Sequence, residues 1–145
     1  MLLALMSEWD VWHDMKLAKY FAARGKLTKL DARYVEWTAL TYASSEGHLD
    51  IMEALLAAGA DKNKSSRRNG DAPLIHAADV GHVECLKALL SAGADMDKSD
   101  DYGYTPLIRA SINGHVEIAK LILAAGATKD NIDTGGNTAL TLVTE

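Results

Sequence analysis

The feature of this chain that most constrains its fold is a motif that occurs three times at nearly constant spacing. The copies read SSEGHLDIMEALLAAGAD from Ser44, ADVGHVECLKALLSAGAD from Ala78 and SINGHVEIAKLILAAGAT from Ser111. Their Gly-His pairs begin at Gly47, Gly81 and Gly114, in steps of 34 and 33 residues. A fixed step of this size indicates stacked copies of one small unit rather than a single wound core. Such an array offers a long surface for function, rather than a closed pocket.

A second recurring element opens each copy. It reads Thr38-Ala39-Leu40, Ala72-Pro73-Leu74, Thr105-Pro106-Leu107 and Thr138-Ala139-Leu140. With these openings and the Gly-His and Gly-Ala pairs, the chain resembles the ankyrin repeat family, strongly from Thr38 to Val143 and weakly back to Trp9. The His of the family's T-P-L-H motif is absent, and its places hold Thr41, Ile75, Ile108 and Thr141. The resemblance implies an all-α fold, an ankyrin-repeat solenoid of stacked helix-turn-helix units with hairpin-like loop tips.

The repeat step also predicts the domain organisation. The chain is expected to be one ankyrin-repeat domain over 1–145, with a degenerate N-terminal capping repeat at 1–37, full repeats at 38–71, 72–104 and 105–137, and a partial C-terminal repeat at 138–145. The expected helices are Thr38–Ser45, Ile51–Ala58, Pro73–Asp79, Val83–Ala92, Pro106–Ile112 and Val116–Ala125. Either the stack ends on a half repeat, or the sequence ends before the natural protein does. If the stack does end there, an uncovered apolar face at Ile118, Ile122 and Leu123 would favour weak self-association through the C-terminal end.

Composition excludes several classes of function. Apolar residues make up 48% and charged residues 24% of the chain, which is typical of a globular protein. The net charge of −5 argues against a nucleic-acid partner, because such a partner needs a basic surface. No apolar run approaches the ~18 residues of a membrane span, and no secretory signal is recognisable. The single cysteine, Cys85, allows no intrachain disulfide and fits a reducing compartment, so we expect the cytoplasm or the nucleus.

No grouping of residues in the sequence predicts catalysis or metal binding. The resemblance implies that His48, His82 and His115 bond backbone atoms between helices, and zinc would need several ligands converging on one point. Cys85 takes the register position of isoleucine in the flanking copies, which predicts a buried apolar side chain. Asp100 and Asp101 are adjacent and are interpreted as a solvated turn. Nucleotide-binding glycine motifs are absent, so we expect no enzyme, no cofactor and no metal.

The resemblance implies that a partner protein or peptide binds a concave groove formed by the loop tips and the exposed face of the first helix of each repeat. Aligned with the family's repeat, the chain has its groove positions at Tyr34, Trp37, Tyr42, Arg68, Asp71, His76, Asp79, Asp101, Tyr102, Tyr104, Arg109, Ile112 and Asn113. Exposed aromatic and arginine side chains are common energetic anchors of interfaces. Three alternatives stay open: an ordinary solvated groove wall at the column of Tyr42, His76, Arg109 and Leu142, a Trp37 folded onto the first repeat, and a Tyr102 packed across to a neighbouring tip.

Charge along the loops adds a direction to this groove. The loops run from basic, at Lys26–Trp37 and Ala60–Asp71, to acidic, at Ala94–Tyr104 and Ala127–Asn137. Such polarity could orient a partner and speed its encounter, or it could serve solubility alone. The sequence therefore predicts a non-catalytic protein-protein interaction module. The alternative is an ankyrin fragment of a larger regulatory or scaffold protein whose activity lies outside this chain.

Overall fold

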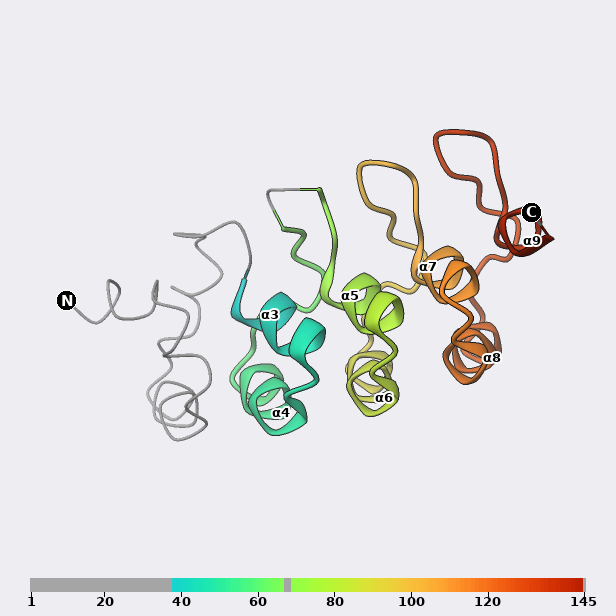
Figure 1. The fold of residues 1–145 in the computed structure, drawn as a ribbon. Coiled ribbons are helices and arrows are strands. Elements are labelled where there is room, and N and C mark those ends of the chain that lie inside the picture. Colours follow the sequence, from blue (N-terminus) through green and yellow to red (C-terminus); the bar gives the residue numbers. More distant parts are fainter. Residues whose placement is uncertain (1–37, 67–68, 145) are drawn as a thin grey trace.

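The structure, a computed structural model, describes residues 38–66 and 69–144, with side chains up to residue 141. The predicted capping repeat at 1–37 lies outside these residues. In the described ranges the regular structure is entirely helical (Figure 1), and each predicted helix is found within two residues of its expected ends. The helices are α3 (Ala39–Glu46), α4 (Leu49–Ala57), α5 (Pro73–Val80), α6 (Val83–Ser91), α7 (Pro106–Ile112), α8 (Val116–Ala124) and α9 (Ala139–Thr144).

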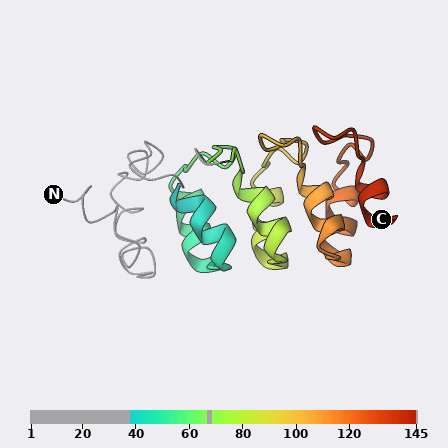
Figure 2. The same ribbon diagram turned by 45° about the horizontal axis from the view of Figure 1, so that its top comes forward.

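The helices form two rows that run along the stack. One row consists of α3, α5, α7 and α9 and is called the inner row here; α4, α6 and α8 make up the outer row. Helices α3, α5 and α7 each pack against the next inner helix and against the outer helix of their own repeat. The loops that follow the outer helices all project from the same side of the stack (Figures 1 and 2). The structure therefore has the repeating architecture that the 33–34-residue step predicts.

Local signals at the helix ends set this architecture. Oγ1 of Thr38 accepts a hydrogen bond from the Thr41 amide at 3.1 Å, and Thr105 caps α7 in the same way. Helices α5 and α7 each begin with a proline, where the missing amide hydrogen costs nothing. The hydroxyl of Thr41 also donates to the Thr38 carbonyl at 2.7 Å. This bond ties the turn together at one of the positions where the family's usual histidine is missing.

Histidine rings connect each repeat to the one before it. Nε2 of His82 donates to the Ser45 carbonyl at 3.0 Å, and Nε2 of His115 donates to the Asp79 carbonyl at 3.1 Å. Each ring lies over the glycine that ends the preceding inner helix, so a Cβ atom on Gly47 or Gly81 would lie 2.7 Å from a ring carbon. The expected backbone role of these histidines is therefore confirmed for His82 and His115.

The end of the stack differs in part from the prediction. Ile118 and Ile122 were expected to lack cover, but both are fully buried because α8 turns them towards the core shared with α6 and α7. Leu123 is exposed, as expected, and Leu140 is 74% exposed although its counterpart Leu107 is only 5% exposed. Uncovered apolar surface is thus carried by α9 and the outer edge of α8. Self-association through this surface stays a prediction.

Two glycines provide a matched test of the contacts between repeats. Gly81 and Gly114 both have positive φ, at 95° and 71°, but only Gly81 lies beneath a histidine ring. Gly114→Ala should cost about 1–2 kcal/mol, the price of a left-handed backbone for alanine. Gly81→Ala should cost at least about 1 kcal/mol more, because its methyl group displaces His115 and breaks the bond to Asp79. Urea unfolding measures both values; equal losses would show that the ring contact contributes nothing.

Cys85 provides a test of the core. Its side chain is buried, as predicted, and burial raises the pKa of the thiol to about 11. A protonated, buried thiol reacts slowly because the thiolate is the nucleophile. We expect a thiol reagent at pH 8 to label the native protein at least ~100-fold more slowly than the urea-unfolded chain. Labelling at the same rate in both states would contradict the buried position of this helix face.

Candidate partner-binding groove

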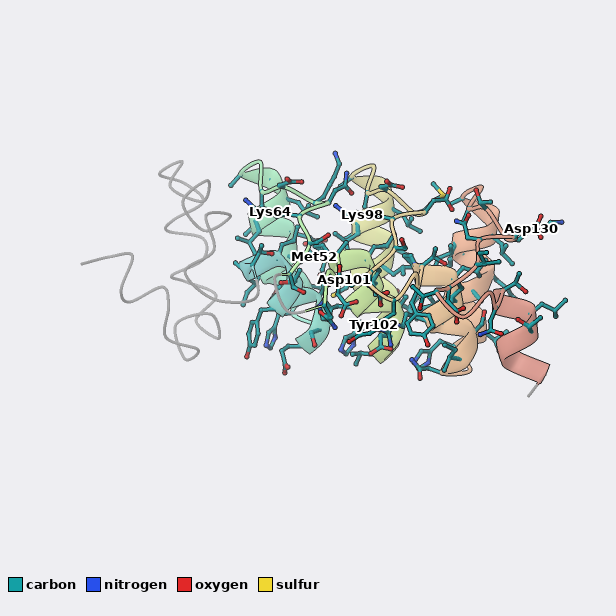
Figure 3. The ribbon with its side chains drawn as sticks, turned by 90° about the horizontal axis from the view of Figure 1, so that it is seen from above. Met52, Lys64, Lys98, Asp101, Tyr102 and Asp130 are labelled. Atoms are coloured by element: carbon teal, nitrogen blue, oxygen red, sulfur yellow. The ribbon has the colours of Figure 1, made fainter. Side chains whose placement is uncertain are left out.

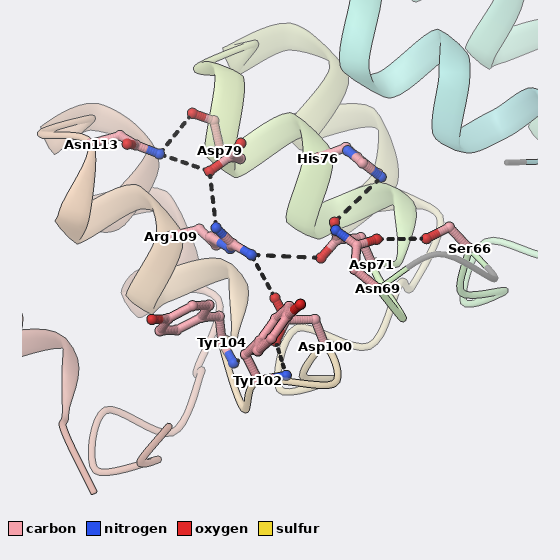
Figure 4. Close-up of polar contacts among 10 residues, drawn as sticks. All are labelled: Ser66, Asn69, Asp71, His76, Asp79, Asp100, Tyr102, Tyr104, Arg109 and Asn113. Atoms are coloured by element: carbon pink, nitrogen blue, oxygen red, sulfur yellow. Dashed lines mark hydrogen bonds and ion pairs between the residues drawn. The ribbon is translucent and has the colours of Figure 1, made fainter. Parts of the chain in front are cut away.

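Arg109 is the centre of a polar cluster that joins a loop tip to two inner helices (Figure 4). It lies on α7, and its Nη2 atom donates to Oδ2 of Asp100 in the preceding tip at 2.7 Å. Its Nη1 atom lies 3.7 Å from Oδ1 of Asp79, near the end of α5, and Nη2 lies 4.0 Å from Oδ1 of Asp71, just before α5 begins. One guanidinium group therefore faces three carboxylates from a tip, a helix end and a helix entry. We call these four residues, with His76, the Arg109 cluster.

Asp100 binds the backbone of the tip in addition to the Arg109 side chain. Its Oδ1 atom accepts hydrogen bonds from the backbone amides of Tyr102 at 2.8 Å and Tyr104 at 2.9 Å. Asp133 makes the same two-bond arrangement in the next tip, with Gly135 and Asn137. The sequence interpretation of Asp100 as part of a solvated turn was wrong, since its side chain is completely buried. Its recurrence 33 residues later as Asp133 was the signal that could have revealed this role.

Two tyrosines extend the cluster towards solvent. The Arg109 guanidinium carbon lies 4.5 Å from the centre of the Tyr104 ring, which is a cation–π distance. The rings of Tyr104 and Tyr102 are 6.3 Å apart between centroids, and Tyr102 is 55% exposed. Asn113 extends it in the other direction, because its side-chain amide donates to Oδ1 of Asp79 at 2.8 Å and to the Asp79 carbonyl at 3.0 Å. The tip in Ala94–Tyr104 is called the second tip here, because it is the second within the described residues. A continuous chain of contacts thus runs from the second tip to the end of α7.

Burial perturbs the titration of this cluster. Burial raises the pKa of Asp71 to about 6, and the charge of Asp100 adds to this effect although Arg109 opposes it. Burial also lowers the pKa of His76 to about 4, so this ring is neutral at pH 7. Burial acts to lower the pKa of Arg109, but its hydrogen bond to Asp100 and the charges of Asp100, Asp71 and Asp79 outweigh this and raise the pKa above its ordinary value. At neutral pH, Arg109 is therefore the cation of the cluster and His76 adds no charge.

The structure brings together most of the predicted groove residues that it describes. Asp71, His76, Asp79, Tyr102, Tyr104, Arg109 and Asn113 belong to the contact chain, and Asp101 and Ile112 are exposed beside it. The expectation that Tyr42 and His76 line an open groove wall is corrected, because these side chains are only 6% and 7% exposed. The sequence prediction assumed that a buried position would be apolar in every repeat, and both of these side chains carry polar atoms. Tyr34, Trp37 and Arg68 lie outside the described residues.

Two other kinds of feature, a metal-binding cluster and a membrane-spanning helix, are not found among the described residues. Within the ranges 38–66 and 69–144, histidine, cysteine and acidic side chains form no group that could hold a metal ion. The same residues contain no helix long and apolar enough to cross a membrane.

Family models cover most of the region that the structure describes. A model of ankyrin repeats in three copies matches residues 63–134. A single ankyrin repeat model matches residues 36–67. The two matches together span more than half of the chain. A search of curated proteins found no match.

The Arg109 cluster predicts opposite pH dependences for two of its members. The pKa of Asp71 is raised, so this group adds stability below about pH 4 and loses it as pH rises through about 6. The pKa of His76 is lowered, so this group adds stability above about pH 6.5 and loses it as pH falls through about 4. Between these limits the two effects oppose each other, which flattens the profile of the native protein.

Substitution should separate the two effects. Relative to the native protein, Asp71→Asn should lose about 2 kcal/mol of stability between pH 7 and pH 4, because the proton uptake of Asp71 is gone. Relative to the native protein, His76→Gln should gain stability as pH falls from 7 to 4, because the buried histidine that loses stability on acidification has been removed. Urea unfolding at half-unit pH steps gives both profiles. Profiles that run parallel to that of the native protein would contradict the buried positions of these two groups.

Proposed function

The chain belongs to the ankyrin repeat family, and from this premise we propose that it is a non-catalytic module that binds another protein or peptide through its concave groove. Ankyrin repeats are generally protein-protein interaction modules. The groove in question is the surface between the loop tips and the inner row of helices. We include in the proposal a cytoplasmic or nuclear location, which the single, buried cysteine supports.

The observation that carries this proposal is the contact chain from Tyr102 to Asn113. It passes from an exposed aromatic ring through Tyr104 and Arg109 to Asp79 and Asn113, and so crosses from a tip to the helix ends of two repeats. Each member is held by another, so a partner would meet side chains that are already ordered. Preorganisation of this kind favours affinity because less conformational entropy is lost on binding. Aromatic and arginine side chains are also the usual anchors of such surfaces.

The geometry changes which groove residues are suitable for testing the proposal. Arg109 compensates three carboxylates, two of them buried, so Arg109→Ala would leave buried charge unpaired and destabilise the fold itself. Tyr102 and Ile112 are better choices, because both are exposed and neither belongs to the buried core. Loss of binding from either substitution can therefore be assigned to the surface.

We expect Tyr102→Ala to weaken binding of the partner by about 2 kcal/mol, as removal of an aromatic anchor does. Ile112→Ala should weaken it by about 1 kcal/mol through lost apolar contact. The matched controls are Lys87→Ala and Glu117→Ala on the outer row, which should each change binding by less than about 0.5 kcal/mol. The partner for this titration is obtained by pull-down with the intact chain and mass spectrometry.

The opposite pattern would overturn the groove assignment. If Lys87→Ala or Glu117→Ala abolished binding while the two groove substitutions were silent, the interface would lie on the outer row. Unfolding curves of all four variants serve as the control that each protein is folded during the titration.

A further inference from the structure

We infer that the groove over α5, α7 and the second loop tip recognises a basic segment of its partner, with a lysine or arginine at the Asp79 carboxylate and an apolar side chain beside it at Val80 and Ile112. This inference rests on the proposed function and goes further, because it names the chemistry of the partner. It depends on the distribution of charge, on an incompletely satisfied carboxylate and on the apolar side chains next to it.

Charge on the described part of the groove is mostly negative. Among groove positions whose side chains the structure describes, the acidic residues are Asp71, Asp79 and Asp101, and the cation is Arg109. Arg109 is already engaged by Asp100, which is buried behind it and adds a further carboxylate. His76 contributes no positive charge at neutral pH, since burial lowers its pKa to about 4. The described groove positions therefore carry more carboxylates than cations.

Three of the described lysines, Lys64, Lys98 and Lys87, lie outside these groove positions. Figure 3 shows Lys64 and Lys98 along one edge of the row of loops, with Asp101 and Tyr102 set back from that edge. The Lys98 ammonium group donates to the Asn63 carbonyl, within the same edge. Lys87 pairs with Glu84 on the outer helix α6. These three lysines therefore do not cancel the negative potential of the described groove positions.

One carboxylate oxygen of the Arg109 cluster, Oδ1 of Asp71, is buried without a hydrogen-bond partner. Asp71 is 5% exposed, and its Oδ1 atom accepts no hydrogen bond. This atom is aimed at Arg109 (Figure 4), but the distance to Nη2 is 4.0 Å because Asp100 holds that nitrogen at 2.7 Å. A poorly solvated carboxylate projects its field further than an exposed one, since water screens it less. Three carboxylates and one guanidinium leave the cluster with an excess of negative charge, which a second cation near Arg109 would reduce.

Asp79 is the member of the cluster that a partner can reach. Its side chain is 42% exposed, whereas those of Asp71 and Asp100 are 7% and 0% exposed. Asp79 is also held in place by Asn113 and faces Arg109 at 3.7 Å, so its position is fixed before binding. A lysine or arginine of a partner would form its ion pair here, at the border between solvent and the buried carboxylates.

Apolar surface next to Asp79 indicates that the partner also carries an apolar side chain beside its basic residue. Val80 and Ile112 are both exposed, and they are the chain neighbours of Asp79 and Asn113, which are hydrogen bonded to each other. That bond holds the ends of α5 and α7 together and brings the two apolar residues to the same part of the groove. A partner segment with an aliphatic or aromatic residue close to its basic residue would cover both.

The test is a selection of peptides displayed on phage from a random library against the intact chain. Selected peptides are synthesised, and each is titrated against the native protein and against Asp79→Asn, Tyr102→Ala and Glu117→Gln. Asp79→Asn and Glu117→Gln change the net charge equally, but Glu117 lies on the outer helix α8. We expect the peptides to carry a net positive charge, and Asp79→Asn to raise their Kd about five-fold or more, against less than about 1.5-fold for Glu117→Gln.

The possible results separate the inference from the proposed function. Neutral or acidic peptides whose binding is lost in Tyr102→Ala would leave the groove as the interface and overturn the basic partner. Equal weakening by Asp79→Asn and Glu117→Gln would also overturn it, because attraction to the overall charge would then be sufficient. Peptides that bind but are insensitive to both Tyr102→Ala and Asp79→Asn would contradict the groove function itself. Replacing the basic residue of a selected peptide by glutamate should abolish binding to the native protein.

Discussion

The helix pairs that the structure describes bury their apolar faces by packing against neighbouring pairs. The inner helices meet at alanines that are completely buried: Ala43, Ala77, Ala78 and Ala110. Small side chains let these helices approach closely enough for His82 and His115 to reach carbonyl groups of the preceding repeat. The packing of successive inner helices also sets the spacing of the loops, because each loop connects an outer helix to the next inner helix. The position of the second tip over α5 and α7, and therefore the groove, depends on the same stacking.

The Arg109 cluster connects this stacking to function. Asp100 orders the tip through two backbone amides and holds Arg109 through its other oxygen, while Arg109 reaches back to Asp79 on the preceding repeat. Three carboxylates around one guanidinium are not the most stable arrangement for a buried site, and the raised pKa of Asp71 reflects this cost. Perturbed groups of this kind often lie at functional sites. The cluster gives the groove both rigidity and negative potential, and these are the two properties that recognition of a basic segment requires.

The repeat step was sufficient to predict the helices, and local register was sufficient to predict the burial of Cys85. The step is a direct consequence of stacking, so it is visible in the sequence without knowledge of any contact. The environment of Asp100 could not be inferred from the adjacent acids, because its burial depends on Arg109, nine residues further on, and on the tip folding back. Tyr42 and His76 were misplaced for a similar reason: a polar side chain can be buried when neighbouring elements supply partners. Ile118 and Ile122 were misplaced because α6 and α7, rather than a following repeat, cover them.

The central claim is that partners bind the surface between the loop tips and the inner helices. Its most direct test is to follow the backbone amide resonances of the intact, isotope-labelled chain while a binding partner is titrated in. The account predicts that the largest shift changes occur at Val80, Tyr102, Arg109 and Asn113, with small changes along α6 and α8. Changes concentrated on α6 and α8, with the resonances of the second tip and α7 unmoved, would contradict it.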